Sequence, residues 1–146
     1  MNIIRANLSY LEQIVPLFDA YRVFYKRESD IAAARAYIQA RLENHEATIY
    51  LAMEDETALG LAICYSTFSS VALKRLVILN DLFTIPEARG KGVGTALLAT
   101  CQEFARDQGC AVLRLRTAHD NLTAQSVYEK FGFARDTVYY TYDLKL

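Results

Sequence analysis

The sequence is poor in the residues that build metal centres and disulfide frameworks, and it contains no tryptophan. Its 146 residues include three cysteines, with no C-x-x-C pair, and two histidines, His45 and His119. A disulfide framework needs an even set of cysteines, and a metal site needs clustered Cys or His ligands. We therefore expect no metal and no disulfide, and Cys64, Cys101 and Cys110 are expected to be structural thiols.

The sequence also lacks an excess of positive charge and a long apolar run. It has 16 Lys and Arg against 17 Asp and Glu, so its net charge of −1 provides no broad cationic surface for a phosphate backbone. The amino terminus has no basic region followed by an apolar run, and no segment approaches the ~20 apolar residues of a membrane span. We expect neither nucleic acid nor a membrane as partner, and the cytoplasm as location.

Glycine and proline are scarce, whereas hydrophobic residues are abundant. There are six Gly and two Pro, and 53% of the residues are hydrophobic. This composition is typical of a packed globular chain. Because 146 residues are the usual size of one domain and the sequence shows no repeat or linker, a single domain over residues 1–146 is expected.

Helical and strand-like patterns are mixed along the chain. Strands are expected at Ile3–Arg5, Thr48–Met53, Leu59–Thr67, Val71–Ile85, Val112–Thr117 and Thr137–Leu144. Helices are expected from a capping box at Ser9 and Glu12 to Tyr25 with a break at Pro16, from Ile31 to about Asn44, from Val93 to Gly109, and ending at Gly132. This order predicts the α/β class, with helices on both faces of a mixed sheet.

A glycine-rich loop is the strongest local signal. Arg89-Gly-Lys-Gly-Val-Gly-Thr95 lies between a long apolar strand and an amphipathic helix. Glycines allow backbone amides to approach a phosphate, and the positive end of the helix dipole favours the same anion. The spacing fits neither the G-x-x-x-x-G-K-[ST] loop of nucleoside triphosphatases nor the G-x-G-x-x-G of dinucleotide folds.

Two motifs resemble those of the GNAT superfamily of N-acetyltransferases. Arg89-x-x-Gly92-x-Gly94 resembles its acyl-CoA pyrophosphate loop, and Asn121-x-x-Ala124-x-x-x-Tyr128 followed by Gly132-Phe133 resembles its later motif. The resemblance is close from about Leu73 to Tyr142 and is limited to the order of elements before that. Tyr21–Tyr25 and Leu79–Phe83 resemble the branch of yeast-type histone and polyamine acetyltransferases.

The resemblance implies a GNAT fold and acetyl-CoA as cosubstrate. The mixed sheet would have about six to seven strands and be splayed at its centre, where the backbone after the bend pairs with the pantetheine arm. The loop amides would bind the pyrophosphate. The expected cofactor-binding residues are Leu82, Phe83, Thr84, Arg89, Gly90, Lys91, Gly92, Val93, Gly94, Thr95, Asn121 and Ala124.

Two residues are candidates for proton transfer. By resemblance, the Tyr128 hydroxyl protonates the departing CoA thiolate, although a tyrosine on an amphipathic helix can also simply pack. Asp81 stands inside a hydrophobic strand, where a carboxylate is costly without a partner or a role. It is interpreted as the proton acceptor or the amine anchor, or else as a side chain that stabilises a bulge.

Several residues near the expected acceptor site keep two interpretations. Tyr21, Phe24 and Tyr25 either wall the pocket or pack in the core. Glu28 and Asp30 either attract a cationic substrate or are only solvated, and His119 either shuttles protons or is an exposed loop residue. Asn121 either binds the pantetheine arm, caps the following helix, or does both.

The predicted function is therefore acetyl transfer from acetyl-CoA to a primary amine by direct attack in a ternary complex. The acceptor is a small amine or a lysine or N-terminal amine, and a noncatalytic acyl-CoA sensor is the alternative. The resemblance also implies a homodimer through the final strand, in which Tyr139, Tyr140 and Tyr142 either provide an aromatic surface or are core and pocket residues.

Overall fold

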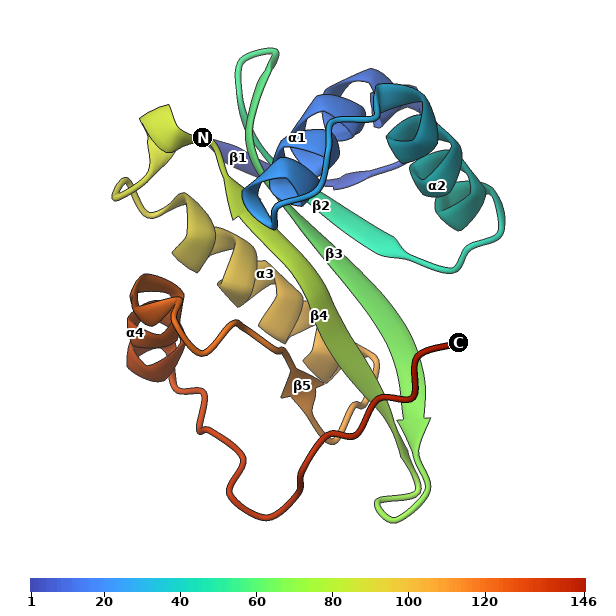
Figure 1. The fold of residues 1–146 in the computed structure, drawn as a ribbon, viewed down its shortest axis with the longest axis vertical. Helices are drawn as coiled ribbons and strands as arrows, with labels where there is room; N and C mark the ends of the chain where they lie inside the picture. Colours follow the sequence, from blue (N-terminus) through green and yellow to red (C-terminus); the bar gives the residue numbers. More distant parts are fainter. The chain divides into compact units, whose positions relative to one another are not determined.

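The computed structural model describes all residues from 1 to 146. Its elements are β1 (Asn2–Ala6), η1 (Leu8–Tyr10), α1 (Leu11–Phe24), α2 (Ile31–Glu43), β2 (Thr48–Glu54), β3 (Thr57–Ser69), β4 (Lys74–Thr84), η2 (Pro86–Ala88), α3 (Val93–Asp107), β5 (Leu113–Arg114) and α4 (Leu122–Phe131) (Figure 1). They form two compact units, Met1–Arg116 and Thr117–Leu146. No helix combines the length and the apolar character that a membrane crossing requires.

The first unit is built on a five-stranded mixed sheet in the order β1-β2-β3-β4-β5. The pairs β1–β2, β2–β3 and β3–β4 are antiparallel, and the pair β4–β5 is parallel. The α1–α2 pair packs on one face, where Ile14, Phe18 and Ile38 join the core, and α3 covers the other (Figure 1). The α/β class with helices on both faces is confirmed.

The sheet has fewer strands than expected, five instead of six to seven. The Thr137–Leu144 prediction is wrong, because no strand forms there. Asp136 Oδ1 accepts hydrogen bonds from the backbone amides of Val138 (2.8 Å) and Tyr139 (3.2 Å), a local arrangement that competes with pairing in a sheet. Val112–Thr117 contributes only the two paired residues of β5.

The first helix also differs from its prediction. The Asn7 side chain accepts from the Ser9 amide, and Glu12 pairs with Arg35 of α2, so the expected capping box does not form. Pro16 lies inside α1, which nevertheless continues to Phe24. Because Pro16 is on the exposed side of the helix, water can solvate the carbonyl that its missing N–H leaves free.

A buried carboxylate fixes the connection between α1 and α2. Asp19 accepts from the Ser29 hydroxyl (2.6 Å) and from the Asp30 amide (2.8 Å), and Asp30 caps α2 through the amide of Ala33 (3.0 Å). The hydrogen bond from Ser29 is the main reason why the pKa of Asp19 lies below its ordinary value. Asp30 is therefore a helix cap, a role that neither of its two interpretations included.

Gly60 brings β3 close to β4 and α3. A Cβ atom at this position would lie 2.7 Å from the Phe83 carbonyl oxygen and 3.0 Å from Cγ1 of Val93. Only glycine fits without displacing backbone. The glycine thus sets how closely the end of β4 and the beginning of α3 approach β3.

Candidate functional site

The glycine-rich loop leads directly into α3. Gly90 (φ +73°) and Gly92 (φ +82°) adopt left-handed conformations, and the Gly92 carbonyl accepts the first helical bond from Ala96 (3.0 Å). The first amides of a helix have no partner within it, and the first turn of α3 carries no acidic side chain. Gly94 lies beside Thr84, its ideal Cβ position 4.0 Å from Oγ1. This arrangement has the features that suit an anion at the end of β4.

The edge of β4 next to this loop has no strand partner. β5 pairs only with Val77 and Ile78, so the sheet is open beyond them. On the other side, the Ile85 amide donates to Leu59 of β3 (2.9 Å). Because hydrogen-bonded positions alternate in an antiparallel ladder, the backbone groups of Leu82 and Thr84 face the open edge and those of Phe83 face β3.

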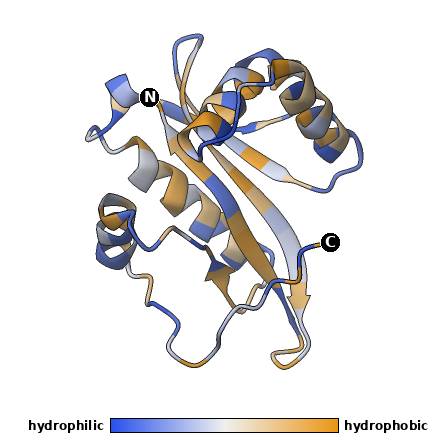
Figure 2. Ribbon diagram, in the orientation of Figure 1, coloured by the Kyte–Doolittle hydropathy of each residue, from blue (hydrophilic) through white to orange (hydrophobic).

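A bulge interrupts β4 at Asn80. The register passes from Leu79, opposite Cys64, to Asp81, opposite Ile63, and leaves Asn80 without a counterpart. The Asn80 side-chain amide donates to Asp81 Oδ1 (3.0 Å). In Figure 2 a hydrophilic stretch crosses an otherwise largely hydrophobic β4. A bulge re-aims the strand's side chains, and here it places a carboxylate against α1.

Asp81 is a buried carboxylate without a cationic partner. Asp81 is 4% exposed, and its carboxylate forms no ion pair. Burial raises the pKa of Asp81, while hydrogen bonds with Tyr21 and Asn80 oppose that rise. Both donors are neutral, so the protein does not compensate a negative charge at this position by one of its own cations. A positively charged ligand would supply the missing charge.

Arg89 links the loop to α1. Its Nε donates to the Thr84 carbonyl (3.2 Å), and its guanidinium carbon lies 5.8 Å from the ring centre of Phe24 and 6.0 Å from that of Phe83. These contacts place the Arg89 charge at the open edge of β4. They also bring an aromatic residue from α1 to that edge.

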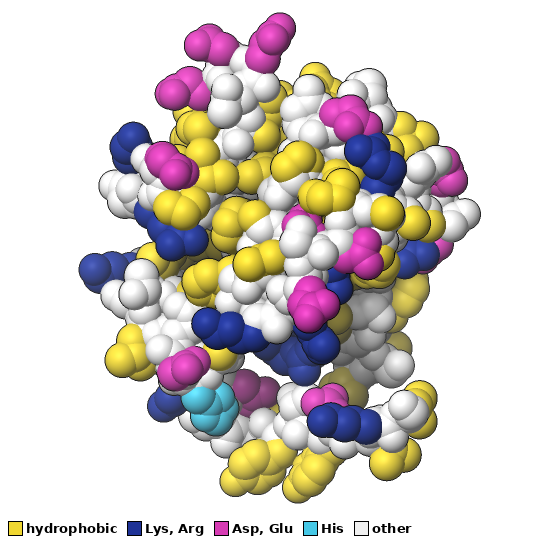
Figure 3. All heavy atoms as spheres, turned by 45° about the horizontal axis from the view of Figure 1, so that its top comes forward, with side chains coloured by type: hydrophobic (Ala, Val, Ile, Leu, Met, Phe, Trp, Pro, Cys, Tyr) yellow, Lys and Arg dark blue, Asp and Glu magenta, His cyan; other side chains and the backbone are white.

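Of the aromatic residues of α1, Tyr21 contacts the bulge. Tyr21 lies 6.4 Å from the Phe83 ring and 4.9 Å from that of Tyr25, and Phe24 and Tyr25 are 48% and 42% exposed. In Figure 3 exposed hydrophobic side chains lie among interspersed acidic and basic ones. Their exposed fractions make Phe24 and Tyr25 surface residues, whereas Tyr21 is partly buried. Glu28 is exposed and forms no ion pair.

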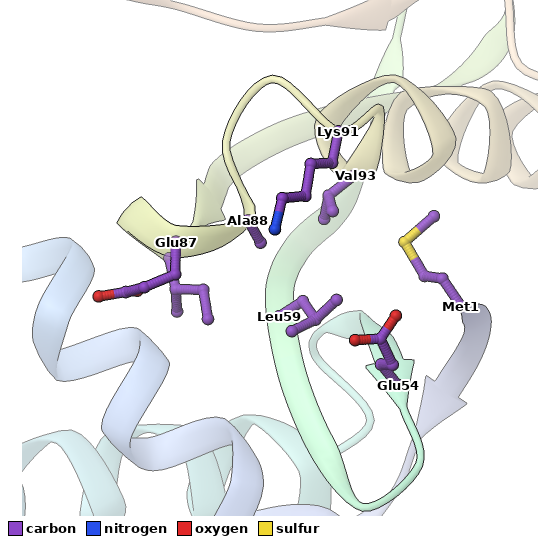
Figure 4. A pocket seen from close by; sticks show the side chains of 8 residues that line it. Met1, Glu54, Leu59, Glu87, Ala88, Lys91 and Val93 are labelled. Carbon is purple, nitrogen blue, oxygen red and sulfur yellow. The ribbon is translucent and has the colours of Figure 1, made fainter.

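The flank of the loop facing the β2–β3 hairpin contains a cavity of about 290 Å³. Figure 4 shows the Lys91 side chain extending from the loop toward Ala88 and Leu59. The cavity is lined by Met1, Glu54, Leu59, Ile85, Glu87, Ala88, Lys91 and Val93. Lys91 and Val93 are thus the two predicted site residues that line this cavity.

The later motif forms a capped helix in the second unit. Asn121 Oδ1 accepts from the Ala124 amide (3.3 Å), which is the capping role predicted for it. Tyr128 lies in the last turn of α4, where its carbonyl accepts from the Phe133 amide (3.0 Å) and its ring meets that of Phe133 at 5.9 Å. His119 is exposed, and its carbonyl accepts from the Gln125 side chain (3.0 Å).

Cys64 and Cys101 form a buried pair of thiols. Cys64 and Cys101 are buried with their sulfur atoms 3.6 Å apart, and this contact, together with burial, raises the pKa of the Cys64 thiol. A thiol that resists ionisation is a poor nucleophile.

Sequence reasoning overlooked three features that shape this region. The Tyr21 hydroxyl donates to the Asn80 carbonyl (3.4 Å) across 59 residues, and no local pattern indicates such a contact. The role of Asp19 was likewise hidden, because aspartate inside a helix is usually solvated. Gly60 could have been found, since an isolated glycine inside a strand pattern indicates a close approach.

The chain is similar to known acetyltransferases. The profile of the Acetyltransferase (GNAT) family matches residues 12–133. The chain is 45% identical over 146 residues to YhfO, an uncharacterised N-acetyltransferase of Bacillus subtilis (strain 168), covering 100% of this chain and 98% of that protein. The crystal structure of a probable acetyltransferase matches with a TM-score of 0.95 and 39% identity, over 100% of this chain and 98% of the other. The aminoglycoside N-acetyltransferase AAC(6')-Iy in complex with CoA shares the fold, with a TM-score of 0.83 and 23% identity over 99% and 95% of the two chains.

Proposed function

Since the chain belongs to the GNAT family of acetyltransferases, we propose that it transfers the acetyl group of acetyl-CoA to a primary amine by direct attack in a ternary complex. Acetyl-CoA-dependent N-acetyl transfer follows from the family, whereas the acceptor and the mechanism are the proposal. One observation carries it: Asp81 is a buried carboxylate that lacks a cation, beside the open edge of β4. A protonated amine provides the complementary charge.

Two features of the first unit support the binding of the pyrophosphate and the pantetheine arm of acetyl-CoA. The unpaired amides at the start of α3 and the left-handed glycines suit the pyrophosphate, and the open backbone at Leu82 and Thr84 suits the amide groups of the pantetheine arm. A strand-edge amide aimed at the thioester oxygen stabilises the charge that develops there. We assign the pyrophosphate to residues Arg89–Thr95 and the pantetheine to the β4 edge, with Asn121 and Ala124 as further contacts.

Asp81 has the properties of the group that receives the amine proton. An amine with a lysine-like pKa near 10.4 needs about 4.6 kcal/mol to lose its proton at pH 7, so a base must assist. Burial raises the pKa of Asp81 and so makes it a stronger base than an exposed aspartate. The carboxylate first attracts the ammonium group and then takes its proton, which leaves the neutral amine free to attack.

Tyr128 is proposed as the acid that protonates the departing thiolate. The proposal rests on its place in the later motif, seven residues after Asn121, on a helix capped at both ends. Caps at both ends hold the backbone that carries Tyr128 in a defined helical conformation. Replacement of Tyr128 by Phe should slow turnover without weakening acetyl-CoA binding.

The acceptor is proposed to be a small amine or a lysine or N-terminal amine. An aminoglycoside acetyltransferase shares the fold at 23% identity, which supports the fold and leaves the acceptor open. The noncatalytic sensor has no observation in its favour, because the relative that is 45% identical over the whole chain is named an N-acetyltransferase.

The test is CoA release from acetyl-CoA across polyamines, amino acids, lysine peptides and aminoglycosides, with acetyl-CoA binding measured by calorimetry. Asp81→Asn should lose most turnover and keep acetyl-CoA affinity, while Glu103→Gln, which removes an exposed carboxylate on α3, should change neither. Full activity of Asp81→Asn with its preferred amine would exclude Asp81 as the base.

Two further points belong to the proposal. Residues 1–146 are taken to act as one N-acetyltransferase domain, which is supported by a family match that extends across both compact units. A homodimer is proposed through the tyrosines of the final segment, because Tyr139, Tyr140 and Tyr142 are 79%, 88% and 89% exposed. Light scattering on the wild-type protein and on a variant with these tyrosines changed to Ser tests the dimer.

A further inference from the structure

The hydroxyl of Tyr21 joins α1 to the polar groups of the β4 bulge. It donates to the Asn80 carbonyl (3.4 Å) and also hydrogen bonds with the Asp81 carboxylate. A phenol has a single proton, so these two acceptors share it. With the Asn80 side-chain amide on Oδ1 (3.0 Å), two neutral donors hold the carboxylate.

The ring of Tyr21 is fixed by its neighbours. It lies 6.4 Å edge-on to Phe83 of the strand that carries Asp81, 6.5 Å from Phe18 and 4.9 Å from Tyr25. These contacts set the position of the hydroxyl before any ligand binds. A hydroxyl that is fixed in advance orients its partner without a further entropic cost.

We propose that Tyr21 is a positioning residue, whose hydroxyl holds the Asp81 carboxylate at the bulge in the orientation that an acceptor ammonium requires. This inference rests on the proposed function of Asp81. Tyr21 does not react with either substrate. It acts through Asp81, and it makes the orientation of the base depend on where α1 packs.

Besides Tyr21 and Asn80, which donate hydrogen bonds to Asp81, two residues of β3 face its carboxylate. Cys64 and Tyr65 approach from β3, and Tyr65 is hydrogen bonded in turn to Tyr37 of α2 (2.7 Å). None of them carries a positive charge. The hydrogen bond from Tyr21 lowers the pKa of Asp81 against the effect of burial, so its loss leaves Asn80 as the only opposing donor.

The test compares Tyr21→Phe with Tyr25→Phe, which removes a neighbouring hydroxyl that takes part in no hydrogen bond. The Asp81 carboxyl is titrated by ¹³C NMR in the full chain, with its resonance assigned from the Asp81→Asn variant. Tyr21→Phe should shift that titration to higher pH and lower kcat/KM for the amine roughly tenfold at neutral pH. The acidic limb of the plot of kcat/KM against pH should also shift to higher pH. The KM for acetyl-CoA should stay unchanged.

The outcomes separate this inference from the function on which it rests. If Asp81→Asn is inactive but the Asp81 titration of Tyr21→Phe coincides with that of the wild type, the positioning role is refuted and the base stands. If Asp81→Asn turns over normally, both are refuted. A shift of the same size in Tyr25→Phe would show a general loosening of α1 and would also overturn the inference.

Discussion

Replacing Asp81 by Asn should make the protein more stable at neutral pH, although it removes the proposed base. Asp81 is buried, has two neutral hydrogen-bond donors and forms no ion pair, so its ionised form is more costly in the folded chain than in the unfolded one. Asparagine has nearly the same shape and carries no charge. The substitution therefore removes a destabilising charge and keeps the packing.

The pH dependence gives the sign of the effect. The folded pKa of Asp81 is raised above its ordinary value of 3.8, so the folded state binds the proton more tightly. The stability due to the protonated form is complete below pH 3.8 and is lost as the pH rises through the folded pKa. Each pH unit between the folded and the unfolded pKa amounts to about 1.4 kcal/mol, or about 4–5 °C in Tm for a chain of this length.

Thermal unfolding of both proteins between pH 4 and pH 8 measures this difference. The Tm of Asp81→Asn should exceed that of the wild type at pH 7, and the two curves should converge toward low pH. A variant that is less stable by the same amount at every pH would show that the carboxylate mainly supports the bulge, and the argument for a functional charge would fail.

Three other substitutions test the geometry. Gly60→Ala should cost about 1–3 kcal/mol in urea denaturation, because its Cβ would meet the Phe83 carbonyl at 2.7 Å. Gly92→Ala forces a side chain into a left-handed conformation at φ +82° and should cost about 1–2 kcal/mol, with weaker acetyl-CoA binding by calorimetry. Asp19→Asn should have the opposite pH dependence to Asp81→Asn: the pKa of Asp19 is lowered, so its contribution is present above pH 3.8 and lost as the pH falls through the folded pKa. Its Tm deficit should therefore be largest at neutral pH, and a deficit that is independent of pH would contradict the role of the charge.

The short-range features could be predicted from the sequence because they depend on neighbouring residues. The conformation of Gly90 and Gly92, the start of α3 directly after them and the Asn121 cap of α4 all involve residues within a few positions of each other. The same locality made the family recognisable, since its two motifs are local, and the family prediction is confirmed. The cofactor-binding and catalytic roles of these residues stay predictions.

The final segment shows why a pattern alone does not determine a strand. Thr137–Leu144 alternates in a way that suits a sheet, but a strand exists only where a second strand accepts its hydrogen bonds. Here Asp136 occupies the amides of Val138 and Tyr139 instead. Similarly, Ser9 and Glu12 have the spacing of a capping box, and Asn7 and Arg35 take their hydrogen bonds.

The sequence by itself determined the α/β class, the phosphate-type loop and the presence of an unusual carboxylate in an apolar strand. Only the tertiary structure decided what surrounds that carboxylate. Tyr21 reaches the bulge from a helix 59 residues earlier, and β5 ends its pairing after Ile78, so the edge beside Asp81 stays open. Contacts between residues so far apart depend on how helices pack on a sheet, and this packing is the sum of many weak interactions that no local spacing records.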